Sequence, residues 1–116
     1  MYLEPQRLTD LFAEFQTSNG EARLRIAAAI AQAARLQPHL LLAYLDELID
    51  GMGCDSMPSV RFQAAAMMGH TACYAHVVPL VAPALLEMLG DPDATVRSQA
   101  LTALTDIGKQ HPDWRQ

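Results

Sequence analysis

The side chains best suited to chemistry gather between positions 70 and 76, where two histidines flank a cysteine. Residues three apart on a helix share a face, so His70 and Cys73 could reach one metal ion, joined by His76 and Cys54. This spacing matches no common zinc pattern, and isolated His and Cys residues in a central helix are usually packing or surface residues. The sequence therefore predicts no metal site and no cofactor.

A second group with chemical potential is the carboxylate cluster of Asp46, Glu47 and Asp50. Paired carboxylates can act as general acid and base. Here they lie between apolar residues at helical spacing, so a solvated helix face explains them. Because the chain also has no glycine-rich phosphate loop and no nucleophile motif, we expect a protein that is not an enzyme.

The elements that position these residues are predicted to be helices of a single domain spanning residues 1–116. The composition is 51% hydrophobic but only 6% aromatic, and alanine and leucine dominate, which favours an all-α fold. The formal net charge is -5 with eight Lys and Arg residues, which argues against a nucleic-acid groove.

Two features bear on location. The N-terminus lacks the basic and then apolar order of a secretory signal, so the sequence predicts a cytoplasmic protein. Residues 62–86 contain no charged side chain and are numerous enough to cross a bilayer. Pro79 and Pro83 divide this stretch into two helices, and the middle of a helical stack must be apolar on several sides, so we expect no membrane span.

Helical spacing of apolar residues predicts six helices in three pairs, over about 4–36, 38–75 and 78–110. Pro58 suits the first turn of the fourth helix, and Pro92 that of the sixth. Gly90 ends the fifth helix, and Asp91 is expected to cap the sixth by accepting from its free N–H groups.

The chain repeats itself. Counting back 36 positions from Asp91, Val96, Arg97 and Ala100 gives Asp55, Val60, Arg61 and Ala64, and a second step gives Asn19, Leu24, Arg25 and Ala28. In the first copy a register two residues earlier, with Ala22 and Arg23, also fits, because it places Ile26, Ala29 and Ile30 on buried positions. A fixed period of this length indicates stacked helical pairs, which usually bind other molecules.

Three successive features together resemble the HEAT repeat. They are a helix with an apolar end, a turn that contains Asp, and the pattern Val-Arg-x-x-Ala-x-x-Ala-Leu. The best copy is Leu85 to Gly108, and Leu48 to Thr71 is a weaker one. The resemblance implies a right-handed α-α superhelix of three stacked antiparallel helix pairs, with the second helices on its concave side. It also implies a ladder of turn and helix-start residues between repeats, here Asn19, Asp55, Asp91, Arg25, Arg61 and Arg97.

Members of that family act mostly as scaffolds, adaptors and carriers. The resemblance therefore implies a module that binds a protein or peptide through its concave face or an end pair. The side chains expected on the concave face are Gln63, Met67, His70, Tyr74, Gln99, Thr102 and Asp106.

Two alternatives remain open. A homodimer through an end pair is one, because Leu3, Leu8, Phe12 and Phe15 of the first helix cannot all face inward if Tyr2 and Leu11 do too. A small subunit of an enzyme or lyase complex is the other, since phycobilin lyase subunits resemble this repeat pattern.

Overall fold

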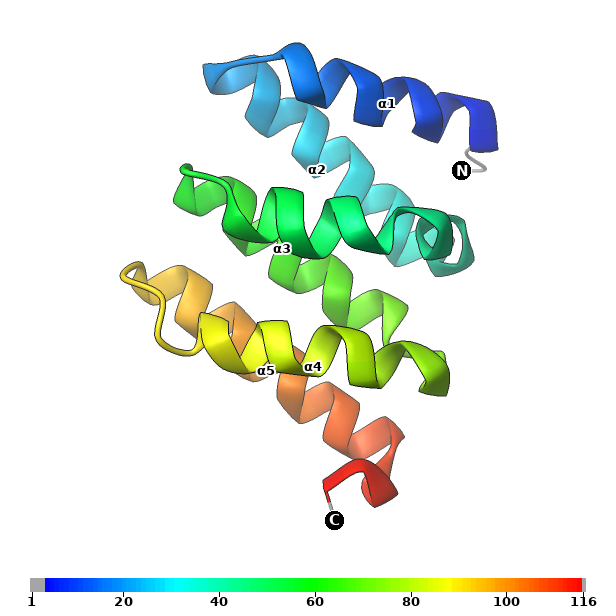
Figure 1. The fold of residues 1–116 in the computed structure, drawn as a ribbon, viewed down its shortest axis with the longest axis vertical. Coiled ribbons are helices and arrows are strands. Elements are labelled where there is room, and N and C mark those ends of the chain that lie inside the picture. The colour runs from blue at the N-terminus through cyan, green and yellow to red at the C-terminus, as the bar shows by residue number, and fades with distance from the viewer. Residues whose placement is uncertain (1–3, 116) are drawn as a thin grey trace.

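The computed structural model describes residues 4–115, and within this range the chain forms helices and turns with no strand. The helices stack in two layers, from α1 (Pro5–Thr17) at one end to α5 (Ala94–Gln110) at the other (Figure 1). The outer layer contains α1, residues 38–54 and α4 (Val78–Met88), and the inner layer contains α2 (Gly20–Leu36), α3 (Pro58–Thr71) and α5. The predicted all-α superhelical fold is confirmed.

Helix α1 begins at Pro5, whose missing N–H costs nothing in a first turn. Its apolar residues keep the predicted helical spacing and are all buried: Leu8, Leu11, Phe12 and Phe15. The sequence argument for a homodimer therefore loses its basis in this helix, because one helix face accommodates these residues. Tyr2 and Leu3, the remaining residues of that argument, lie outside the described part of the chain.

The first helix of the middle pair is irregular. It consists of a 3-10 helix, η1 (Pro38–Tyr44), a π-helical turn, η2 (Glu47–Gly51), and a second 3-10 turn, η3 (Met52–Cys54). Changes in winding shift residues around the helix axis, yet Leu41, Leu48 and Met52 still reach the core. Periodicity predicted a helix here but not its changes in winding.

Helix α3 is the centre of the stack, because it packs against both α2 and α5. A Cβ atom added to Gly69 would lie 3.1 Å from the Cβ of Ala103, so glycine permits the close approach of α3 and α5. The three outer-layer segments contact one another only sparsely. The stack therefore curves with α2, α3 and α5 on its concave side.

The turns between the two helices of each pair lie along one edge of the stack (Figure 1). This placement brings each turn next to the turn of the neighbouring pair. No helix within residues 4–115 is long and apolar enough to span a membrane.

Candidate functional site

Arg61 connects the second and third turns. Its Nη1 donates to the carbonyl oxygens of Asp55 and Ser56 at 2.8 and 3.1 Å, in the turn that precedes its own helix. Its Nε and Nη2 donate to the two carboxylate oxygens of Asp91 at 2.8 and 3.0 Å. The side chains are 15% and 8% exposed, respectively. This bidentate pair is the rung that the resemblance implied.

The first rung uses Arg23. Its Nε and Nη2 donate to Oδ2 of Asp55 at 2.9 and 2.6 Å, and its Nη1 donates to the carbonyl of Phe15 at 2.6 Å. The guanidinium carbon lies 3.8 Å from the centre of the Phe15 ring, which adds a cation–π contact. Of the two registers that the sequence left open, the earlier one therefore holds for the ladder arginine. Of the residues that it was expected to bury, Ile30 is buried and Ile26 is half-buried, but Ala29 is exposed.

The ladder positions predicted for Arg25 and Asn19 are wrong. Arg25 is exposed and comes no closer than 4.0 Å to a carboxylate, that of Glu21. Arg23 and Arg61 are 38 residues apart, whereas Arg61 and Arg97 are 36 apart, so a fixed period fails across the irregular segment 38–54. In the corrected register Asn19 corresponds to the helix cap Asp93, and Thr17 occupies the place of the ladder aspartate.

The residue that caps α5 is Asp93. The prediction from the sequence, Asp91, is therefore wrong. Oδ1 of Asp93 accepts from the backbone N–H groups of Thr95 and Val96 at 2.9 and 3.3 Å. Asp91 instead accepts from the N–H of Asp93 at 2.9 Å, which orients its carboxylate toward Arg61. Two aspartates in one turn thus divide the work of capping and pairing.

Hydrogen bonding from Arg61 holds the pKa of Asp91 below its ordinary value. A carboxyl whose pKa is lower in the folded state stabilises that state above its unfolded pKa of about 4, and this contribution is lost as pH falls through the folded pKa. We expect the free energy of unfolding to decrease more steeply below about pH 4 in the wild type than in Asp91→Asn. Urea titrations at several pH values measure this difference, and parallel pH profiles would contradict it.

A hollow of about 260 Å³ opens on the concave side between the three inner helices. We call it the His70 hollow, and its polar lining residues are Arg35, His70, Cys73, Gln99, Asp106 and Gln110. Its floor is formed by small residues, Ala66, Gly69 and Ala103, because α3 and α5 approach closely there. Small floor residues leave room for a ligand side chain.

Burial is the main influence on the protonation of His70, and nearby charges modify it. Burial lowers its pKa, Arg35 lowers it further, and Asp106 partly opposes both. The imidazole is therefore neutral near pH 7 and provides one donor and one acceptor nitrogen. Together with the amide of Gln99, it equips the hollow with the groups that bind peptide backbone.

A second and wider hollow, of about 520 Å³, lies on the same three helices near their N-terminal ends. We call it the Phe62 hollow, and it is lined by Leu24, Arg25, Ala28, Ser59, Phe62, Gln63 and Thr95. The largest side chain in this lining is that of Phe62, which is half-buried. The hollow provides an apolar surface with one cation, Arg25, beside it.

The residues predicted to face the concave side have different positions. His70, Gln99 and Asp106 line the His70 hollow, and Gln63 lines the Phe62 hollow. Thr102 is exposed, and its hydroxyl donates to the carbonyl of Ser98 at 3.1 Å.

Tyr74 and Met67, also predicted to face the concave side, are packed against the core. Tyr74 is half-buried against the core, with its ring centre 6.1 Å from that of His76. Met67 is fully buried, so its assignment to the concave surface was wrong. Helix α3 is covered on both sides by α2 and α5, and its buried face is therefore wider than a helical stripe would predict.

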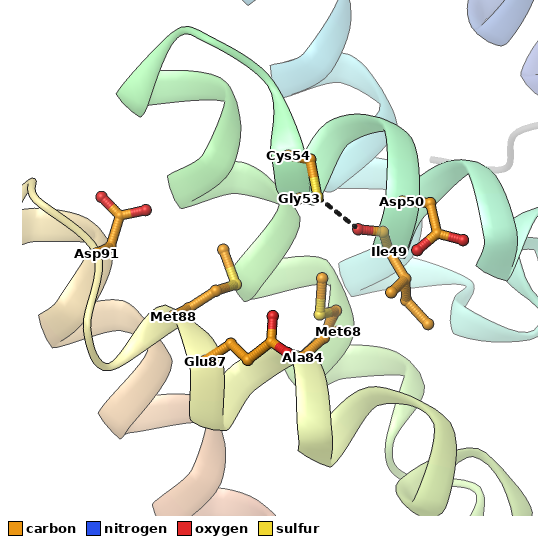
Figure 2. A pocket seen from close by; sticks show the side chains of 9 residues that line it. All are labelled: Ile49, Asp50, Gly53, Cys54, Met68, Ala84, Glu87, Met88 and Asp91. Carbon is orange, nitrogen blue, oxygen red and sulfur yellow. Dashed lines mark hydrogen bonds between the residues drawn. The ribbon is translucent and has the colours of Figure 1, made fainter.

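The candidate metal ligands are separated in the structure. His70 and Cys73 share the His70 hollow, but Cys54 lines a hollow of about 210 Å³ on the outer layer. Figure 2 shows Met68 and Met88 in that hollow, with Cys54 beside them donating its thiol to the Ile49 carbonyl at 3.9 Å. Within residues 4–115 no three His, Cys, Asp or Glu side chains are placed to hold a metal ion.

The acidic residues Asp46, Glu47 and Asp50 are exposed on the outer layer, as a solvated helix face requires. Sequence reasoning missed Arg35, Leu24 and Phe62, which line the concave hollows. Their spacing carries no signal by itself, because each comes from a different helix or helix end.

The helices are paired in two layers, Arg–Asp pairs form a ladder between the turns, and hollows lie along the inner layer. These features define an α-helical repeat protein. Residues 8–105 match the family described as HEAT repeats, and the chain belongs to this family. No curated protein and no solved structure matches the chain. HEAT repeats generally mediate interaction between proteins or act as scaffolds.

Proposed function

We propose that this chain is a non-enzymatic protein-binding module that holds an extended polypeptide segment against α2, α3 and α5. The observation that carries the proposal is the His70 hollow, where a neutral imidazole and an amide lie over a floor of small side chains. An extended peptide presents backbone N–H and C=O groups, and each needs a partner when it is buried. His70 and Gln99 supply such partners.

The Phe62 hollow gives the segment a place for an apolar side chain. Burial of one large apolar side chain contributes about 1.5–3 kcal/mol. Phe62 and Leu24 provide most of the apolar surface there, and both are only half-buried in the free chain. One ligand side chain in this hollow and backbone contacts at His70 would fix the direction of the segment.

Charge selects the kind of segment. The outer layer exposes mainly carboxylates (Asp10, Glu14, Asp46, Glu47, Asp50 and Glu87). In the inner layer Asp106 offsets Arg35 within the His70 hollow, whereas the Phe62 hollow has the exposed Arg25 and no carboxylate in its lining. A segment with an apolar residue and a nearby carboxylate would complement this surface, and a basic one would be attracted to the opposite layer.

Cytoplasmic location is part of the proposal. Cys54 and Cys73 are free thiols, exposed on different faces of the stack. Free exposed thiols are typical of a reducing compartment.

The two cysteines also provide the test. The tagged chain is purified from native cells together with its bound partner. The intact complex is then treated with N-ethylmaleimide, and the alkylated cysteines are identified by mass spectrometry. We expect the partner to slow alkylation of Cys73 and to leave Cys54 unaffected, because only Cys73 lines the His70 hollow. Protection of Cys54 with Cys73 still reactive would place the partner on the outer layer and refute the proposal.

Matched variants test the same surface. The double substitution His70→Ala with Gln99→Ala should weaken binding about tenfold or more, since each hydrogen bond contributes about 0.5–1.5 kcal/mol and about 1.4 kcal/mol corresponds to a factor of ten. Asp46→Ala with Glu47→Ala, on the outer layer, should leave the affinity unchanged. Equal affinities for all three proteins would show that the hollow does not bind the partner.

A further inference from the structure

Arg97 repeats the arrangement of the other ladder arginines but lacks their carboxylate. Its Nη1 donates to the carbonyls of Asp91 and Pro92 at 2.7 and 3.1 Å, as Arg61 does to Asp55 and Ser56. These bonds fix the guanidinium in the ladder orientation. Its Nε and Nη2 donate no hydrogen bond to residues 4–115, although the Asp91 carboxylate attracts the guanidinium from a distance, and the side chain is exposed. In both other rungs Nε and Nη2 of the arginine bind an aspartate. In Arg97 this side of the guanidinium, which we call the Arg97 edge, is therefore exposed to solvent.

An apolar side chain lies one helical turn beyond Arg97. Leu101 is 58% exposed, and the residues at its position in the two preceding repeats, Ala65 and Ala27, are both 0% exposed. The equivalence follows from the ladder register, because each of these residues lies four positions after its ladder arginine. In the other repeats this position is buried against the next helix pair.

The neighbouring helix contributes to the same surface. Ala84 of α4 faces the preceding pair, in the hollow of Figure 2. Leu86 lies about 200° further round the helix, so it points away from that pair, toward the end of the stack. It is 52% exposed. Leu86, Arg97 and Leu101 thus form an end surface with the composition of an inter-repeat interface.

We propose that this end surface docks a helix pair of another polypeptide, whose inter-helix turn carries an aspartate that pairs with Arg97. Continuity with the internal interfaces defines the occupant: the same arginine fork, in the same turn, binds an aspartate from the following pair in both rungs that the chain completes. The leucines would cover the apolar side of that pair. The proposal is independent of the concave surface and gives the chain a second partner.

A second copy of this chain is a poor occupant. At the opposite end of the stack the position of the ladder aspartate is Thr17, which has no charge to pair with Arg97. Two copies joined through their end surfaces would bring two Arg97 cations together. A partner with its own acidic turn avoids both problems.

Site-specific photo-crosslinking in native cells tests the proposal. The full chain carries a benzophenone amino acid at Leu101 or, as a control of similar exposure on α4, at Leu80, which is 53% exposed. We expect position 101 to link to another protein within a helix pair whose turn contains an aspartate, and position 80 not to do so. A link to a second copy of the chain, equal links from both positions, or no link would overturn the proposal.

Charge variants separate pairing with Arg97 from simple apolar contact. Arg97→Gln should reduce the link from position 101 about tenfold or more, whereas the concave double variant His70→Ala with Gln99→Ala should leave it unchanged. Arg97→Asp combined with aspartate→Arg in the partner's turn should restore it. Circular dichroism verifies that each variant is folded, and an undiminished link in folded Arg97→Gln would refute the role of the ion pair.

Discussion

Replacing Ala100 with aspartate is expected to unfold the helix pair formed by α4 and α5. Ala100 is 0% exposed, so the new carboxylate would be buried without a partner. Burial of an unpaired polar or charged group costs several kcal/mol, and a domain of this size has a total stability of about 5–15 kcal/mol. Circular dichroism at 25 °C should show a large loss of helix. If helix remains, thermal unfolding followed by circular dichroism should be much less cooperative than in the wild type.

The matched control is Ala29→Asp. It makes the same chemical change in the interior of helix α2, but Ala29 is exposed. The lower helix propensity of aspartate should cost only about 0.5 kcal/mol there. If the melting temperature of Ala100→Asp equalled that of the control, Ala100 would not be a core residue and the packing of α5 would be wrong.

The substitution Arg61→Gln should destabilise the chain by about 2–3 kcal/mol. It removes the bidentate pair with Asp91 and the bonds from Nη1 to the carbonyls of Asp55 and Ser56. The Asp91 side chain is only 8% exposed and would retain its charge with little solvent to compensate. Urea denaturation gives the free energy of unfolding directly.

Two other arginines make this experiment specific. Arg25→Gln should cost less than about 0.5 kcal/mol, because the ion pair of Arg25 with Glu21 is exposed and 4.0 Å long. Arg23→Gln should cost about as much as Arg61→Gln, since both hold the carboxylate of the following turn. A large cost at Arg25 with a small one at Arg23 would contradict the ladder seen in the structure.

The ladder residues and the residues of the two proposed surfaces have different roles. Arg23, Arg61 and their aspartates serve the scaffold, because they connect one repeat to the next. In the two proposals, specificity for partners belongs to residues that differ between repeats, such as His70 in the concave hollow and Leu101 at the end of the stack. The two proposed interfaces would let one small chain connect two other proteins.

Local sequence determined much of this protein. Turn residues, prolines and apolar spacing predicted helices over most of their observed length, because these signals act within a few residues of the chain. The rung between Arg61 and Asp91 was implied by the resemblance to HEAT repeats, and the structure contains it because the second and third copies are joined without an insertion.

Tertiary structure decided what depends on contacts between distant segments. The irregular winding of residues 38–54 and the spacing of 38 residues across it moved the first rung from Arg25 to Arg23. The contacts of α3 on two sides turned Met67 inward. The His70 hollow is lined by side chains from three different helices, α2, α3 and α5. The Nε and Nη2 side of Arg97 is exposed because no described residue supplies a carboxylate that it could bind. A helical period records which side of one helix is apolar, whereas the neighbours that cover that side come from other parts of the chain.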